Sequence, residues 1–290
     1  MADRIDLHVH TLASDGSDSP AAVVERAKAL GLRALAITDH DTFAGIPEAL
    51  ETGSRLGVEV VPGVELSTMY AGEHVHLLGY YMDENAPELR ALMRRAGDER
   101  TRRNETMVRR LHDAGYPIDM ESLRAEYPGQ TMLGRPHVAA YLMRRGYVDS
   151  VRGGVVELMG RGKPFYVERE HIPLEDYIRA LRAAGGMPVV AHLYQYRYTP
   201  EQLETMVTAA AGAGAVGLEG MYSTYTPEQQ ASVFAMAERY GLLCTGGSDY
   251  HGTRKPHIAL GTGLGELNVP YALLAALKAR AGRTEQRKEI

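Results

Sequence analysis

The chain has 290 residues, of which 44% are apolar and 24% charged, the profile of a soluble globular protein with a sizeable core. Its net charge of −5 argues against duplex nucleic acid as a partner, because duplex binding normally needs a basic face. No apolar run approaches the roughly 20 residues that span a bilayer, and the first residues do not resemble an export signal. Cys244 is the only cysteine, which excludes an internal disulfide, so we expect a cytoplasmic protein without membrane contact.

The first third of the chain alternates predicted strands and helices. Apolar runs predict strands at residues 4–10, 33–38, 58–66 and 74–82. Periodic segments predict helices at residues 19–32 and 46–57. Ser19 is suited to cap the first helix, Pro20 to begin it and Gly31 to end it.

Residues 85–171 have a different character. Their long charged segments have a helical period and predict helices at residues 88–115, 119–127 and 135–146. A strand signal returns only at residues 164–170. We therefore expect a helical insertion subdomain at 85–171, interrupting one domain formed by residues 1–84 and 172–290.

Alternation resumes in the last third. Helices are predicted at residues 174–186, 200–214 and 227–241, and strands at 187–192, 215–221 and 242–249. Strands that alternate with helices form right-handed βαβ units around a parallel sheet. The fold class is therefore α/β, and the periodicity leaves open whether the sheet closes into a barrel.

Histidines and carboxylates gather at the ends of the predicted strands. They are His8, His10, His40, Glu65, His76, His192, Asp249 and His251. The C-terminal ends of parallel strands meet at one face of a sheet, where active sites form. His8 and His10 are two residues apart, so their side chains point to the same face. Imidazole with carboxylate suits zinc, manganese or iron, and the number of candidates indicates more than one ion.

A family resemblance rests on six segments. IDLHVHTLASDG, AITDHDTFAG, PGVELS, VHLLGY, VVAH and GGSDYHG resemble the successive motifs of the PHP (polymerase and histidinol phosphatase) family. The resemblance covers residues 5–82 and 174–265 and implies a distorted (β/α)7 barrel with two or three divalent ions, manganese being favoured over zinc or iron. It implies a first ion held by His8, His10, Glu65 and Asp249. It implies a second held by Glu65, His76 and His192, and a third held by Asp15, His40 and His251.

The insertion resembles one branch of that family. TMLGRPHVAAYLM and GKPFYV are similar to segments of nucleotide-directed PHP phosphoesterases, in which Gly-Arg-Pro-His lies beside the substrate phosphate. Arg135 would offer a planar fork to phosphate oxygens, and His137 would hydrogen-bond one of them or protonate a leaving group. Lys255 could add a cation, or be a solvated loop lysine.

Several features fit the branch less well or stand apart from it. AHLYQY at residues 191–196 departs from the branch, which usually has Ala-His-Pro there, and this leaves the substrate open. His74, His112 and His171 are interpreted as surface residues and Cys244 as a core residue.

The expected function is that of a metal-dependent phosphoesterase, in which a hydroxide bridging the ions attacks phosphorus. The proton donor could be His137, His192 or Asp249. The favoured substrate is a small nucleotide phosphate, either a 3′,5′-bisphosphate or the end of a short single-stranded RNA. Alternatives are a small cyclic or sugar phosphate, suggested by the AHLYQY loop, a carboxamide, for which Arg135 would not be needed, and a non-catalytic metal-bound module.

Overall fold

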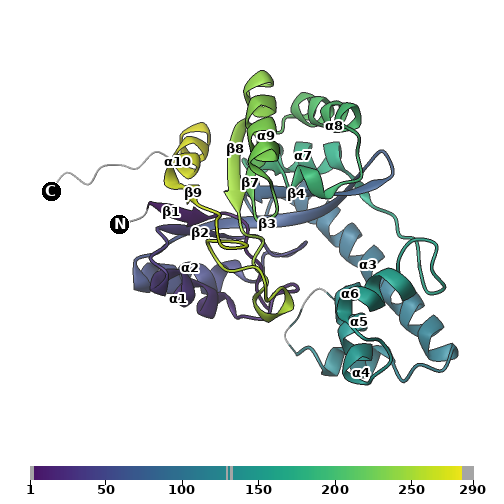
Figure 1. Ribbon diagram of the computed structural model, residues 1–290. Helices are drawn as coiled ribbons and strands as arrows, with labels where there is room; N and C mark the ends of the chain where they lie inside the picture. Colours follow the sequence, from purple (N-terminus) through teal and green to yellow (C-terminus); the bar gives the residue numbers. More distant parts are fainter. Residues whose placement is uncertain (1–2, 129, 131–132, 283–290) are drawn as a thin grey trace.

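The computed structural model describes residues 3–128, 130 and 133–282, and seven of its strands form a nearly closed barrel (Figure 1). These are β1 (Arg4–Asp6), β2 (Ala34–Ile37), β3 (Glu59–Tyr70), β4 (Glu73–Tyr80), β6 (Met187–Val190), β7 (Gly217–Tyr222) and β8 (Leu243–Gly247). Neighbours follow the order β8-β7-β6-β4-β3-β2-β1. The N–H of Leu7 donates to the carbonyl of Gly246 at 3.0 Å, which joins the two end strands. The expected distorted barrel is confirmed.

The distortion lies at β4. This strand runs antiparallel to both β3 and β6, whereas β1, β2 and β3 are parallel, as are β6, β7 and β8. Ala71 and Gly72 make the tight turn between β3 and β4, with φ of 46° and 83°. Two short strands complete the sheet: β5 (Ile172–Pro173) pairs with β3, and β9 (Val269–Pro270) pairs with β1.

Helices cover the outside of the barrel. They are α1 (Pro20–Ala29), α2 (Ile46–Leu56), α7 (Leu174–Ala183), α8 (Pro200–Ala213), α9 (Pro227–Arg239) and α10 (Tyr271–Arg280). The Ser19 hydroxyl accepts from the N–H of Ala22 at 3.1 Å, and Gly31 follows α1 with a φ of 70°, as predicted from the sequence. All four residues of β2 and of β6 are buried, which is typical of strands covered on both faces.

The charged middle of the chain forms helices beside the barrel (Figure 1). They are α3 (Pro87–Asp113), α4 (Met120–Ala125), α5 (Arg135–Arg144) and α6 (Val151–Gly153), followed by a π-helical turn at Gly154–Leu158. Met107, Leu123 and Val138 belong to a hydrophobic cluster of this segment alone. No helix within the described part of the chain is both long and apolar enough to cross a bilayer.

The strand predicted at residues 164–170 is not formed. This segment is irregular, and β5 begins only at Ile172. The carbonyl of Tyr166 accepts from Arg110 Nη1 at 3.0 Å, a side-chain donor in place of a strand neighbour. Tyr166 and Arg169 line a pocket, so side chains of this segment form part of a pocket wall and do not belong to a sheet.

Candidate active site

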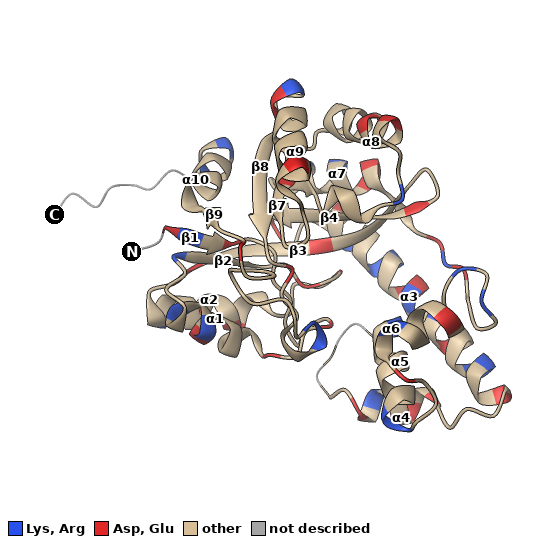
Figure 2. Ribbon diagram, viewed as in Figure 1, with Lys and Arg blue, Asp and Glu red and all other residues tan. Residues whose placement is uncertain are grey.

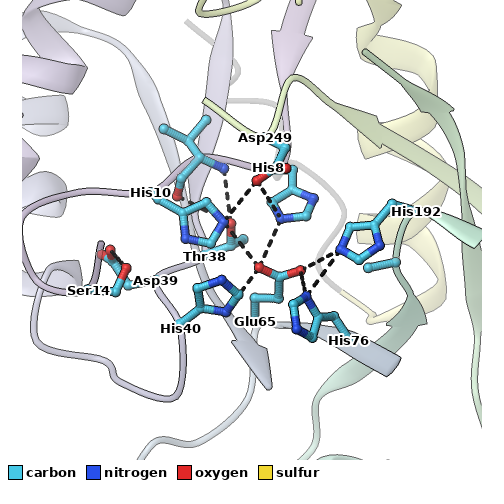
Figure 3. Close-up of polar contacts among 12 residues, drawn as sticks. His8, His10, Ser14, Thr38, Asp39, His40, Glu65, His76, His192 and Asp249 are labelled. Atoms are coloured by element: carbon cyan, nitrogen blue, oxygen red, sulfur yellow. Dashed lines mark hydrogen bonds and ion pairs between the residues drawn. The ribbon is translucent and has the colours of Figure 1, made fainter. Parts of the chain in front are cut away.

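Five imidazoles surround the buried carboxylate of Glu65, which projects from β3 (Figure 3). Nitrogens of three histidines lie 3.2, 3.1 and 3.2 Å from Oε2, namely His8, His10 and His40. Nitrogens of two others lie 2.9 and 3.0 Å from Oε1, namely His76 and His192. The five histidines come from the ends of β1, β2 and β6 and from within β4, so distant parts of the chain converge on one carboxylate.

The spacing of these atoms fits a metal centre. Metal–ligand bonds of roughly 2.0–2.1 Å place the ligands of a tetrahedral ion ~3.3 Å apart. His8 Nε2, His10 Nε2 and His40 Nδ1 are buried and face the Glu65 carboxylate, but none of them makes a well-aligned hydrogen bond to a described residue. Buried imidazole nitrogens normally have a partner, and an ion between them and Glu65 would provide one.

Ligand atoms within 4.8 Å of one another form three groups. One consists of His8, His10, Glu65 and Asp249, another of His10, Asp15, His40 and His251, and the third of His40, Glu65 and His76. His192 Nε2 lies 3.2 Å from His76 Nδ1, beside the third group. The structure thus brings together all nine side chains that the sequence indicated as ligands, and the cluster could hold metal ions.

Glu219 supports this cluster and was missed in the sequence. It is fully buried in β7, where Oε1 lies 2.9 Å from His8 Nδ1 and Oε2 accepts from the N–H of His192 at 2.7 Å. A hydrogen bond to Nδ1 leaves Nε2 of His8 free to face Glu65, as is usual for metal-binding histidines. The available signal was a lone carboxylate inside the apolar strand segment AVGLEGM.

Asp249 is held by two donors on one oxygen. Its Oδ2 accepts from Tyr222 Oη and from Lys255 Nζ, each at 2.7 Å, while Oδ1 lies 3.3 Å from His10 Nε2. Lys255 is therefore engaged with a candidate ligand, and its expected contact with substrate stays a prediction. Asp249 has a φ of 60°, a conformation that non-glycine residues adopt mainly at constrained sites.

The cluster attracts positive charge. Burial alone would lower the pKa of His10, but the nearby carboxylates of Asp249 and Glu65 outweigh it and raise that pKa to about 9. Burial would likewise raise the pKa of Glu65, yet the histidines around it hold that pKa well below its usual value. Metal ions would supply the same positive charge in place of protons.

A pocket of about 240 Å³ opens beside the cluster, between the barrel and the helices of residues 87–158. The lining from the barrel includes three candidate ligands, namely Asp15, His40 and His76, and the lining from residues 85–171 includes four arginines, namely Arg100, Arg103, Arg135 and Arg169. Arg100 pairs with Asp41 and donates to Ser67 Oγ at 3.0 Å. The other three arginines form no ion pair with a carboxylate of the described residues. The sequence pointed only to Arg135, because Arg100, Arg103 and Arg169 lie in segments where charge is expected on any exposed face.

Arg135 and His137 begin α5 at the edge of this pocket, and the two residues Thr131 and Met132 that open their motif lie outside the described residues. Arg135 Nη1 donates to the carbonyl of Met159 at 3.4 Å. The N–H of Gly134 donates to His137 Nδ1 at 3.0 Å, which places the proton of a neutral imidazole on Nε2. Burial lowers the pKa of His137 to about 4. At neutral pH His137 therefore offers a hydrogen-bond donor, and the geometry favours this role over proton donation.

Two histidines that were interpreted as surface residues also line the pocket. The rings of His74 and His171 lie 4.3 Å apart, centroid to centroid, and both residues belong to its lining. His74 is exposed as well as pocket-lining, so its interpretation was incomplete, and half-buried His171 belongs to the pocket wall. His112 is exposed on α3, as expected, and Cys244 is buried.

The AHLYQY loop lies behind the cluster. Tyr196 Oη accepts from the N–H of His76 and donates to the carbonyl of Ala191, both at 2.9 Å. None of residues 193–196, all of which the structure describes, lines the pocket. The departure from the family motif therefore packs against His76 and His192 and forms no part of the pocket wall.

A barrel with a histidine–carboxylate cluster beside a cationic pocket defines a metal-dependent phosphoesterase. The family model of the PHP domain matches residues 6–138. A 5′-3′ exoribonuclease of Haemophilus influenzae is 32% identical, over 87% of this chain and 91% of its own. A phosphoribosyl 1,2-cyclic phosphate 1,2-diphosphodiesterase of Eggerthella lenta is 36% identical, over 87% and 97%. A 3′,5′-nucleoside bisphosphate phosphatase of Chromobacterium violaceum is 32% identical, over 86% and 87%.

Solved structures agree with these sequence relatives. A Bifidobacterium adolescentis protein, assigned by prediction to the metal-dependent phosphoesterases, superposes with a TM-score of 0.84 at 30% identity over 98% of this chain and 97% of its own. A Chromobacterium violaceum amidohydrolase, solved with bound sulfate and no metal, gives 0.83 at 30% identity over 96% of each chain. The chain belongs to the PHP family.

Proposed function

We propose that this protein hydrolyses a nucleoside 3′,5′-bisphosphate, with two or three divalent ions held by the cluster around Glu65. The observation that carries the proposal is the lining of one pocket, which combines candidate metal ligands with three arginines that have no carboxylate partner among the described residues. Such a pocket fits a small molecule with two anionic groups. One phosphate would lie at the ions and the other at the arginines.

The ions would be manganese, with zinc or iron as alternatives, because imidazole and carboxylate ligands suit all three. When bound, they would supply an activated water and polarise the phosphoryl oxygens. Glu219 would hold His8 and the backbone of His192 in position, and Tyr222 with Lys255 would fix Asp249. His192 and Asp249 stay the candidates for protonating the leaving group.

Arg135 and His137 would read the phosphate. A guanidinium presents two parallel donors to phosphate oxygens, and a neutral His137 would donate from Nε2. Because both residues lie on α5, we propose that residues 85–171 act as a subdomain placed over the mouth of a barrel formed by residues 1–84 and 172–290. A direct contact supports this placement, since Gln130 Nε2 donates to the carbonyl of Ser14 at 2.6 Å.

A cyclic phosphate diester is the second candidate substrate. The Eggerthella relative, whose name gives such a substrate, is 36% identical over 97% of its length. That name also places two phosphate groups on one molecule, so the same pocket would suit it. A carboxamide would leave the arginines without a charged partner, and a non-catalytic role would leave the full ligand cluster unused.

The test is a phosphate-release screen in the presence of manganese. It compares 3′,5′-bisphosphates, nucleoside monophosphates, cyclic phosphates followed by a phosphatase, short 5′-phosphorylated RNAs and carboxamides. The bisphosphates should give the highest kcat/KM, and a Glu65→Gln variant should be inactive on all substrates. Faster turnover of a cyclic diester would favour the second candidate, and hydrolysis of carboxamides alone would overturn both.

A further inference from the structure

A second hollow adjoins the pocket on the other side of the Arg100–Asp41 ion pair. This groove has a volume of about 440 Å³ and lies between the loop after β2 and the start of α3. Its volume is within the roughly 300–1,000 Å³ of small-molecule sites. The mechanism proposed above does not use it.

The groove begins next to the candidate metal centre. Asp41 lines the groove, and its partner Arg100 lines the pocket, so one ion pair forms the wall between the two hollows. Asp41 directly follows His40, and its N–H donates to the carbonyl of Glu65 at 2.9 Å. A molecule bound at the ions could therefore extend past this wall into the groove.

The surface of α3 is open along the same path. Met93, Gly97 and Arg100 share one face of the helix, because they are four and then three residues apart. Met93 lines the groove and Arg100 lines the pocket, ~10 Å further along the helix axis. A Cβ atom built on Gly97 would meet no atom within 4 Å, so no side chain blocks the helix surface between them.

The groove combines apolar and cationic side chains. Half-buried Phe43 and Met93 supply the apolar surface, and exposed Arg90 and Arg94 supply cations. The acidic lining residues are Glu84 and Asp41, and Asp41 is already paired with Arg100. Arg94 forms no ion pair within the part of the chain that the structure describes. Figure 2 shows basic residues at the end of α3 nearest to β3 and β4. An aromatic ring beside guanidinium groups is the combination that binds single-stranded nucleic acid, through base stacking and backbone contacts.

We propose that this groove binds the second nucleoside of a short single-stranded oligonucleotide whose terminal nucleotide occupies the pocket. The inference rests on the proposed function. In a 3′,5′-bisphosphate, water adds to phosphorus, the P–O3′ bond breaks, and the 3′-oxygen takes a proton as phosphate leaves. In a 5′-phosphorylated dinucleotide the same bond breaks, and the phosphate leaves attached to the second nucleotide. The two substrates differ only in the nucleoside that would lie on Phe43.

The experiment compares kcat/KM for these two substrates, with manganese, in the parent and in Phe43→Ala and Arg94→Ala variants. Each variant should lower kcat/KM for the dinucleotide by about tenfold, the scale of one lost stacking or backbone contact, and change that for the bisphosphate by less than about twofold. Arg95→Ala is the matched control, because Arg95 is an exposed α3 arginine that pairs with Glu170 outside the groove. Its kcat/KM should equal that of the parent for both substrates.

The outcomes separate this inference from the proposed function. One contrary result is that the parent hydrolyses both substrates while the variants affect both equally, or leave the dinucleotide unaffected. Either result would overturn the inference about the groove and leave the proposed function standing. Turnover of neither substrate would overturn the proposed function and the groove with it. If Phe43→Ala does not fold, Phe43→Leu removes the stacking ring and keeps the apolar contact, and the same comparison applies.

Discussion

Among single residues, the clustered arginines of the pocket are expected to destabilise the protein when no anion is bound. Burial and the nearby Arg100 guanidinium together lower the pKa of Arg169 to about 10, although the carboxylate of Asp41 acts in the opposite direction. Arg103 is shifted in the same direction, first by burial and then by Arg100 and Arg135. Arginine stays charged at neutral pH, so the cluster carries mutual repulsion that a bound anion would relieve. Such an arrangement is explained by ligand binding better than by stability.

Arg135→Ala should lower kcat/KM for the best phosphate substrate by about two to three orders of magnitude, the scale of one lost charge-stabilising contact. Arg135→Lys should recover only part of the loss, because an ammonium lacks the two parallel donors. Metal content, measured by elemental analysis, should not change. Arg152→Ala, at an exposed arginine of the same segment, is the control. Parent-like kinetics of Arg135→Ala would show that other cations read the phosphate.

Glu219→Gln should weaken manganese binding by roughly 10–100-fold, because the amide gives a weaker hydrogen bond to His8 Nδ1 and can turn its NH₂ toward it. Isothermal titration calorimetry of the metal measures this directly, and activity should return at higher manganese concentrations. Glu238→Gln on the exposed face of α9 serves as the matched change of charge. Parent-like affinity of the Glu219 variant would assign this carboxylate to barrel stability alone.

These residues show which parts of the site could be predicted from the sequence and which could not. Histidines at strand ends are conspicuous because apolar strands seldom end in His-x-His, so the cluster around Glu65 could be predicted. Glu219 acts through another side chain and lies inside an apolar strand, where one carboxylate gives no spacing pattern. Arg103 and Arg169 could not be singled out from the sequence, because each lies among many other charged residues.

At the scale of elements, the barrel closes where β1 and β8 meet, and Gly247 makes that contact close. A Cβ atom there would lie 2.4 Å from both the Cβ atom and the backbone nitrogen of His8. The methyl group of an alanine could be accommodated only if β1 and β8 moved apart. Because His8 carries a candidate ligand atom, the closure of the barrel and the geometry of the cluster are linked at this glycine.

Gly247→Ala should therefore lower the free energy of unfolding by about 1–3 kcal/mol and weaken metal binding. Urea denaturation and metal titration measure the two effects. Gly212→Ala is the control, because a Cβ atom at this helical position of α8 would meet nothing within 4 Å. That change should stabilise the protein by about 0.4–1 kcal/mol. Unchanged stability of the Gly247 variant would mean that β1 and β8 can move apart more easily than their close contact indicates.

Most elements followed from local signals in the sequence, and the exceptions have physical causes. Caps such as Ser19 and periodic apolar faces located the barrel helices and strands to within a few residues. The segment at 164–170 has residue types typical of a strand, but the carbonyl of Tyr166 accepts from the Arg110 guanidinium, and Tyr166 and Arg169 line the pocket. Only the tertiary structure shows these contacts. The antiparallel direction of β4 was not predicted, although the seven residues between the strands predicted at 58–66 and 74–82 are too few for the crossover that a parallel pair needs.

At the scale of the whole molecule, metal ions should contribute to stability, because they would bind the folded cluster and not the dispersed ligands of the unfolded chain. Manganese at about 100 times its Kd should add about 2.7 kcal/mol, which corresponds to a rise in Tm of roughly 5–10 °C over protein treated with a chelator. Thermal denaturation with and without manganese checks this. Glu65→Gln should show a much smaller rise, and an equal Tm for chelated and manganese-loaded parent would contradict it.

If the cluster around Glu65 is a multinuclear metal centre, the purified protein should bind more than one ion per chain. Purified parent protein is stripped with a chelator, dialysed to equilibrium against manganese and measured by elemental analysis. We expect two or three ions per chain in the parent and a lower number in Glu65→Gln, because the Glu65 carboxylate contacts ligands of all three groups. One ion per chain or none in the parent would contradict it.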